Sequence, residues 1–176
     1  IVSLLATTLV IRFRHLHERF TADNDLGGVQ KFHATPVPRI GGVPVFLGLI
    51  AGVGIAHLKW PSFEAWLLLV AALPAWLAGL MEDMTKRVGP MPRLLATFAA
   101  ALLGFWLIKA GLQRLGIPGV DDMLRQYWLL SLLFTIVAVG GVAHALNIID
   151  GYNGLAGMVA ILTFAVLAYV AYKVGD

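Results

Sequence analysis

The residues best suited to chemistry lie in three short polar segments, each next to a long apolar stretch of the chain. In the segment furthest along the chain, Asp150 and Asn153 each precede a glycine, and Asn147 lies three residues before Asp150. Asp-Gly and Asn-Gly steps let the backbone turn sharply, so these three side chains can be aimed into one small volume. A simple turn needs only one such step, so we interpret the segment as a binding site for a polar ligand. We interpret His144, just upstream, as an interior histidine whose hydrogen bonds are satisfied.

A second polar segment places two adjacent carboxylates, Glu82 and Asp83, directly after a 17-residue apolar stretch. Adjacent carboxylates can hold a divalent cation, and Mg²⁺ commonly links one or two of them to the phosphates of a substrate. The alternative is a charged surface loop in which the two acids pair with Lys86 and Arg87. Taken by itself, the segment fits this alternative better.

The third polar segment carries cations just before an apolar stretch that opens with Gly41 and Gly42. The planar fork of Arg39 suits phosphate oxygens, and Lys31 can act as a point charge beside it. The glycines would let a ligand approach backbone N–H groups at the start of a helix. His33 adds a third potential cation. The alternative is a basic loop that only faces anionic lipid headgroups.

Composition shows what kind of protein must position these segments. The chain has 176 residues, of which 59% are hydrophobic and 13% are charged, against about 25% charged in an ordinary soluble domain. Its mean hydropathy is +0.83. These values predict an integral membrane protein and exclude a disordered chain. The absence of cysteine excludes a disulfide scaffold and redox chemistry at sulfur.

Five apolar stretches are each long enough to cross, or nearly cross, a bilayer. They run from 40 to 58, 65 to 81, 94 to 108, 127 to 146 and 155 to 172. The opening run 1–11 is too short to span and is interpreted as a clipped first helix. The sequence thus predicts an all-α, polytopic membrane helix bundle of about six transmembrane helices. We expect residues 1–176 to form a single membrane domain and to be a fragment of a longer protein.

Alternating spans place the segments 12–39, 82–93 and 147–154 on one face of the membrane, and therefore all three polar segments together. The basic residues of that face are Arg12, Arg14, Arg19, Lys31, Arg39, Lys86, Arg87 and Arg93, and those of the other are Lys59, Lys109, Arg114, Arg125 and Lys173. The excess assigns the first face to the cytoplasm. The high pI of about 9.5 is therefore a topology signal rather than a sign of nucleic-acid binding. The segment 111–126 is predicted to be a turn-rich external connection.

The order and context of the three segments resemble the polyprenyl-phosphate N-acetylhexosamine-1-phosphate transferases, membrane enzymes of bacterial cell-envelope synthesis. The matching motifs are Lys31-x-His33 with Pro38-Arg39-x-Gly41-Gly42, the acidic pair after Gly79-Leu80, and Asn147-x-x-Asp150-Gly151-x-Asn153-Gly154-Leu155. The Pro-Arg-x-Gly-Gly form is more similar to the branch that uses UDP-N-acetylglucosamine than to the muramoyl-pentapeptide branch. Glu82 departs from the family, which usually has aspartate there. A later Gly-Asp-x-Gly-Ser segment and a histidine-rich loop have no counterpart in this sequence, so the resemblance covers roughly the first half of such an enzyme.

The resemblance implies transfer of an N-acetylhexosamine 1-phosphate from a UDP-N-acetylhexosamine to polyprenyl (undecaprenyl) phosphate, with release of UMP. It places a multi-pass protein in the bacterial inner membrane, with its active site on the cytoplasmic face. It leaves the amino sugar, the polysaccharide pathway and homo-oligomerisation open. The implied roles are Mg²⁺ or Mn²⁺ binding and catalysis by Asp83, Asp150 and Glu82, and phosphate neutralisation by Lys31, His33 and Arg39. Asn147 and Asn153 would orient the nucleotide sugar or the metal shell. Asp83 could instead deprotonate the acceptor.

Two other functions compete with this one. A transporter or channel would carry ionisable groups near the bilayer midplane, whereas the predicted spans contain no Asp, Glu, Lys or Arg. A structural subunit without chemistry would not need three polar segments on one face. Phosphoryl transfer between two anions, in contrast, needs cations and accurate positioning, which acids and bases at a membrane boundary supply.

Overall fold

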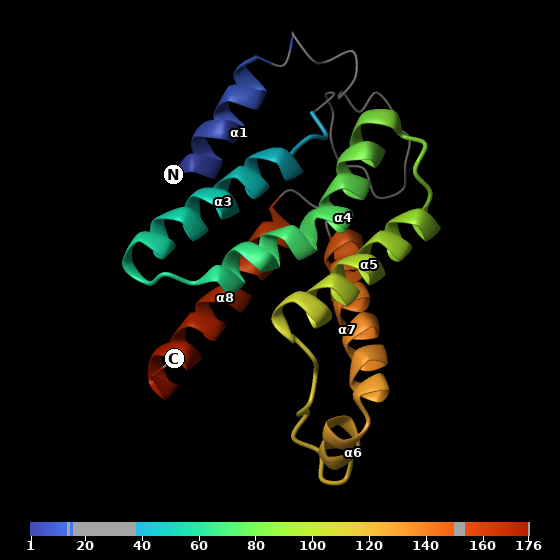
Figure 1. The fold of residues 1–176 in the computed structure, drawn as a ribbon. Coiled ribbons are helices and arrows are strands. Elements are labelled where there is room, and N and C mark those ends of the chain that lie inside the picture. Colours follow the sequence, from blue (N-terminus) through green and yellow to red (C-terminus); the bar gives the residue numbers. More distant parts are fainter. Residues whose placement is uncertain (14, 16–37, 150–153, 176) are drawn as a thin grey trace.

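The computed structural model describes residues 1–13, 15, 38–149 and 154–175, and this part of the chain is helical and without a regular strand (Figure 1). The helices are α1 (Val2–Arg12), α3 (Gly42–Lys59), α4 (Phe63–Thr85), α5 (Pro90–Ile108), α6 (Val120–Gln126), α7 (Trp128–Ile149) and α8 (Leu155–Val174). Within the described residues, α3, α4, α5, α7 and α8 are long and apolar enough to cross a membrane, and α1 is a shorter apolar helix. The prediction of an all-α, polytopic membrane protein is confirmed.

All five long helices extend beyond the apolar stretches that predicted them, α4 and α5 the furthest. The segment 82–93 was expected to be a loop, but α4 continues to Thr85, so Glu82 and Asp83 lie in its last turn. The helix ends where Lys86 adopts a left-handed conformation, with φ 55°. α5 begins at Pro90 because proline lacks an N–H and its fixed φ suits the first helical position. Arg93 therefore lies in the first turn of α5 rather than in a connection.

The central group of helices is α4, α5 and α7, with α5 packed against both of the others. α3 packs against α4, and α1 packs against α3 (Figure 1). Small side chains line these contacts, since Ala71 of α4 and Ala101 of α5 are only 2% and 5% exposed. Small residues let helix backbones approach closely, which is the main source of helix association in a membrane.

Gly140 of α7 illustrates this close approach and leads to a testable prediction. A Cβ added at Gly140 would lie 2.6 Å from Cε1 of Phe98 on α5, whereas a Cβ at Gly141 meets nothing within 4 Å. Overpacking of this kind typically costs about 1–3 kcal/mol. We expect Gly140→Ala to lower the thermal unfolding midpoint in detergent, measured by circular dichroism. Gly141→Ala is the matched control, and equal midpoints for the two variants would contradict this packing.

The connection between α5 and α7 contains the short helix α6, which the prediction of a turn-rich connection over 111–126 did not include. Asp121 explains the local order, because its carboxylate accepts hydrogen bonds from the N–H groups of Leu115 at 2.7 Å and Gly116 at 3.2 Å. These bonds hold the turn before α6 against the first turn of the helix. They favour the ionised carboxylate and lower the pKa of Asp121 below its ordinary value.

The lowered pKa of Asp121 determines how the stability of the turn before α6 depends on pH. Because the folded pKa is depressed, the stabilisation is present above the ordinary aspartate pKa and is lost as the pH falls through the lowered value. We expect Asp121→Ala to speed hydrogen exchange at Leu115 and Gly116 near neutral pH, as measured by mass spectrometry. Asp122→Ala, a change of the exposed neighbouring acid, is the control. Equal exchange rates in wild type and Asp121→Ala would contradict the assignment.

Candidate active site

The acidic pair lies at the end of α4 that faces the start of α3 and the start of α5. Glu82 and Asp83 are both partly buried. The last turn that carries them is closed by local hydrogen bonds, because the N–H of Lys86 donates to the carbonyl of Glu82 at 2.7 Å. The hydroxyl of Thr85 donates to the carbonyl of Met81 at 2.6 Å. Both carboxylates are thus held on regular helix rather than on a loop.

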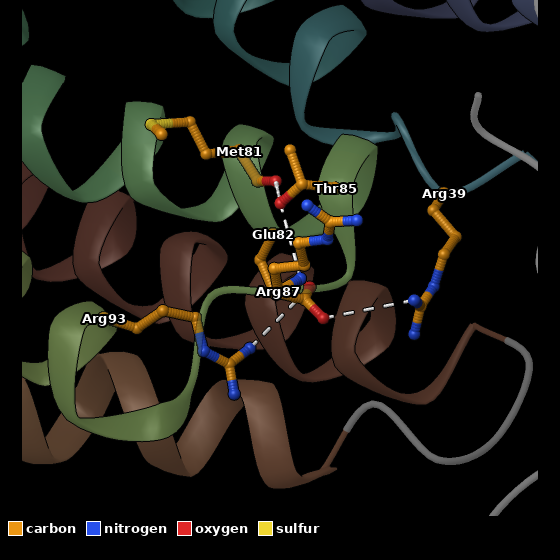
Figure 2. A network of polar contacts seen from close by, with 6 residues as sticks. All are labelled: Arg39, Met81, Glu82, Thr85, Arg87 and Arg93. Carbon is orange, nitrogen blue, oxygen red and sulfur yellow. Dashed lines mark hydrogen bonds and ion pairs between the residues drawn. The ribbon is translucent and has the colours of Figure 1, made fainter.

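Glu82 lies between two arginines that come from different segments (Figure 2). Its Oε1 is 3.9 Å from Nη1 of Arg39, and its Oε2 is 3.9 Å from Nη1 of Arg93. These separations are ion pairs and are longer than hydrogen bonds. The arginine side chains are each 27% exposed, and that of Glu82 is 22% exposed. One carboxylate therefore holds two guanidinium groups side by side at the ends of three helices.

Arg39 is brought to this cluster by contacts at the start of α3. The indole Nε1 of Trp76 on α4 donates a hydrogen bond to the carbonyl of Gly42 at 3.1 Å. The ring of Trp76 also stacks on Phe46, with ring centroids 4.5 Å apart. These contacts fix the first turns of α3 against α4. The residues just before α3, including Arg39, are consequently placed near the last turn of α4.

The ion pairs of Glu82 change the interpretation of the acidic pair. In the competing interpretation, the two acids pair with Lys86 and Arg87, which follow them closely in the sequence. In the structure, Glu82 reaches across to Arg39 and Arg93, residues 43 positions before it and 11 positions after it. Contacts between separate segments favour a functional site over a charged surface loop.

Arg93 is a functional candidate that sequence reasoning missed. In the sequence it contributed only to the count of basic residues. Pro90 starts a helix three residues earlier, which places Arg93 on the first helical turn beside the end of α4. The Gly89-Pro90 step just before it is the sequence signal that could have found it, because proline at the first helical position marks the start of a helix.

Asn147 lies in the last turn of α7 and lines a cavity shared with Arg93. The cavity has a volume of about 210 Å³ and lies between α4, α5 and α7. It is lined by Ala75, Gly79, Arg93, Thr97, Ala143, His144 and Asn147. The structure therefore connects the predicted residue Asn147 with the Arg39–Glu82–Arg93 cluster through Arg93. An apolar cavity of about 230 Å³ shares the wall residues Ala75, Thr97 and Ala143 with it.

The interpretation of His144 as a satisfied interior histidine was wrong within the described part of the chain. Its Nε2 atom is buried and has no hydrogen-bond partner there, and the same holds for Nε of Arg93. The predicted site residues Lys31, His33, Asp150 and Asn153 lie outside the described residues. Their roles remain predictions.

The described residues offer a partial fit for a divalent cation. No group of three His, Asp or Glu side chains with metal-binding geometry occurs among them. Glu82 is engaged by two arginines, which leaves the adjacent Asp83 as the better candidate ligand. Because Mg²⁺ usually takes one or two carboxylates and completes its shell with water and substrate phosphates, Asp83 fits such an ion as one ligand of several.

Fold and site together define a polytopic helical membrane protein with an acidic and basic cluster at one end of its spans. Comparison with known families identifies it further. Residues 65–176 match the family model Glycosyl transferase family 4, and the chain belongs to that family. This confirms the resemblance seen in the polar motifs. No solved structure matches the chain.

Curated relatives come from two branches of the family. The chain is 30% identical over 163 residues to the phospho-N-acetylmuramoyl-pentapeptide-transferase of Ruegeria pomeroyi, covering 86% of this chain and 45% of that protein. A protein of the same name from a Ruegeria strain is 31% identical over 150 residues, covering 78% of this chain and 41% of the relative. The probable undecaprenyl-phosphate N-acetylglucosaminyl 1-phosphate transferase of Bacillus subtilis is 24% identical over 148 residues, covering 83% and 40%. The chain thus spans less than half the length of these relatives, and the choice between branches stays a prediction.

Proposed function

We propose that this chain takes part in transferring an N-acetylhexosamine 1-phosphate from a UDP-sugar to polyprenyl phosphate, with release of UMP. The reaction would occur at the cytoplasmic face of the bacterial inner membrane. The observation that carries the proposal is the cluster of Arg39, Glu82 and Arg93 beside Asp83, at one end of apolar helices. The names of the relatives support it, since one is a probable undecaprenyl-phosphate N-acetylglucosaminyl 1-phosphate transferase and two are phospho-N-acetylmuramoyl-pentapeptide-transferases.

The chemistry matches what the cluster can supply. An oxygen of the lipid phosphate attacks the phosphorus that carries the sugar, a new P–O bond forms, and the bond to UMP breaks. Both reactants are anions, so fixed cations must offset their repulsion and the developing charge. Arg39 and Arg93 are such cations, and the carboxylate of Glu82 between them holds both in place. A strong base is not required, because a phosphate monoester with a second pKa near 6 is largely ionised at neutral pH.

Asp83 and Asp150 are proposed to hold Mg²⁺, or Mn²⁺ in its place, with Glu82 in a supporting role. The metal would supply charge neutralisation on the transferred phosphoryl group. Glu82 acts chiefly through Arg39 and Arg93, which its carboxylate orients. Lys31 and His33 are proposed to neutralise phosphate, and Asn147 and Asn153 to orient the nucleotide sugar.

The lipid acceptor is consistent with the position of the site. A polyprenyl phosphate carries its charge at headgroup depth and its tail among apolar helices. The polar cavity at Arg93 and Asn147 adjoins an apolar cavity between the same three helices, so polar and apolar surfaces lie next to each other at this end of α5.

The test is UMP release from UDP-N-acetylglucosamine in detergent, with Mg²⁺ and undecaprenyl phosphate, repeated with other UDP-amino sugars. The chain should be assayed beside the longest natural form that contains it. We expect release that depends on both the metal and the lipid. If no UDP-amino sugar gives UMP with the longer form, the proposed function is wrong.

A further inference from the structure

The cavity between α4, α5 and α7 brings polar side chains from two helices together. Arg93 and Thr97 are four residues apart on α5, and His144 and Asn147 are three apart on α7, so each pair lies on one face of its helix. The α4 wall contributes only Ala75 and Gly79. The polar lining therefore comes from α5 and α7.

Two of the residues that line the cavity each carry a buried nitrogen atom without a hydrogen-bond partner within the described residues, Nε of Arg93 and Nε2 of His144. The Nη1 atom of Arg93 forms the ion pair with Glu82, and the Nε atom of the same guanidinium takes no part in it. Buried polar atoms in native proteins are almost always paired, so each exception needs an explanation. A ligand that enters the cavity would explain both atoms at once.

The chemistry of the lining specifies the ligand. Arginine Nε can only donate, and the positive charge of Arg93 disfavours a cationic ligand. The hydroxyl of Thr97 already donates to the carbonyl of Leu94 at 2.8 Å. Histidine Nε2 is a second donor when it carries the proton. A ligand that pairs with both nitrogen atoms in that form offers acceptor oxygens, and the charge of Arg93 favours an anion. The cavity volume of about 210 Å³ is several times the roughly 30 Å³ of a water molecule, which leaves room for a phosphoryl group.

We infer that Arg93 Nε and His144 Nε2 together bind a phosphoryl oxygen of a substrate in this cavity. This makes His144 a substrate-binding residue. The inference rests on the proposed function for the identity of the ligand, because the phosphoryl group can come from the lipid acceptor or from the nucleotide sugar. The two sources are separated by measuring each substrate's KM independently.

The experiment compares two variants of His144 in the longest natural form. Glutamine places an amide N–H near the position of Nε2, so His144→Gln keeps the donor, whereas His144→Phe keeps a ring and removes it. Loss of a hydrogen bond to a charged group corresponds to about a tenfold or larger effect. We expect His144→Phe to raise the KM of one substrate about tenfold, with a smaller change in kcat. We expect the KM of His144→Gln to stay close to that of wild type. Val142→Phe is the control, because it adds the same ring to α7 at a position that is 61% exposed.

Each outcome decides the inference. A raised KM for undecaprenyl phosphate alone assigns the site to the acceptor, and a raised KM for the UDP-sugar alone assigns it to the donor. Unchanged KM values in His144→Phe, or equal losses in the glutamine and phenylalanine variants, would overturn it. If the wild type releases no UMP, the readout becomes the rise in unfolding midpoint on adding UDP or undecaprenyl phosphate. A rise in wild type that is absent in His144→Phe supports the site without the reaction, and equal rises overturn it.

Discussion

Replacing Asp83 with asparagine in the longest natural form is expected to lower kcat by about a thousandfold. Asp83 is proposed to hold the metal, and removing one fixed group that stabilises transition-state charge costs about 10² to 10³ in rate. The side chain keeps its size, so the change removes the charge and little else. The measurement is the rate of UMP release at saturating Mg²⁺, lipid and UDP-sugar.

The specificity of this effect is tested by two matched substitutions. Asp122→Asn makes the same chemical change on the exposed side of α6 and should leave the rate within a factor of two or so. Glu82→Gln should slow the reaction less than Asp83→Asn, because it weakens the hold on the two arginines without removing the proposed metal ligand. Wild-type turnover in Asp83→Asn would contradict the proposed role of Asp83.

Replacing Arg93 with glutamine is expected to lower kcat/KM by about a hundredfold. The reason is that Arg93 makes two separate contributions. Its Nη1 atom forms the ion pair with Glu82 at 3.9 Å, and its side chain also lines the cavity that Asn147 lines. Glutamine supplies neither the charge nor a second donor edge. The measurement is kcat/KM for each substrate in the UMP-release assay.

Arg93→Lys separates the two contributions, because a lysine keeps the positive charge but is a single point of charge on a flexible stem. We expect its activity to lie between those of wild type and Arg93→Gln. Arg114→Gln, in the exposed connection after α5, is the control and should behave as wild type. If Arg93→Gln keeps wild-type kcat/KM, Arg93 has no part in the site.

The general fold could be predicted because a bilayer imposes strict conditions on length and polarity. Any helix that crosses it needs a long apolar stretch, so five such stretches predicted five helices directly. The exact ends depended on local chemistry that hydropathy does not measure. α5 begins at Pro90, before the apolar stretch that predicted it. α4 ends at the left-handed Lys86, after the end of its apolar stretch. The short helix α6 was missed because Gly116, Pro118 and Gly119 precede it and are typical of turns.

The site was harder to predict than the fold for a geometric reason. Motif spacing identified Glu82, Asp83 and Arg39, and alternation of the spans placed them on one face. Neither argument could find Arg93, whose role depends on how closely the start of α5 approaches the end of α4. Nor could spacing reveal that Nε2 of His144 has no hydrogen-bond partner in the described part of the chain, because such partners depend on how the helices pack.

The shared carboxylate of Glu82 has a consequence for how this site can evolve. Two guanidinium groups and one carboxylate carry a net charge of +1, and the three positions cannot change independently. A lineage that first loses Glu82 leaves two like charges facing each other without a counter-ion. A lineage that first loses either arginine keeps a neutral pair. The order of substitutions therefore matters, because the effects of changes at three positions in direct contact are not additive.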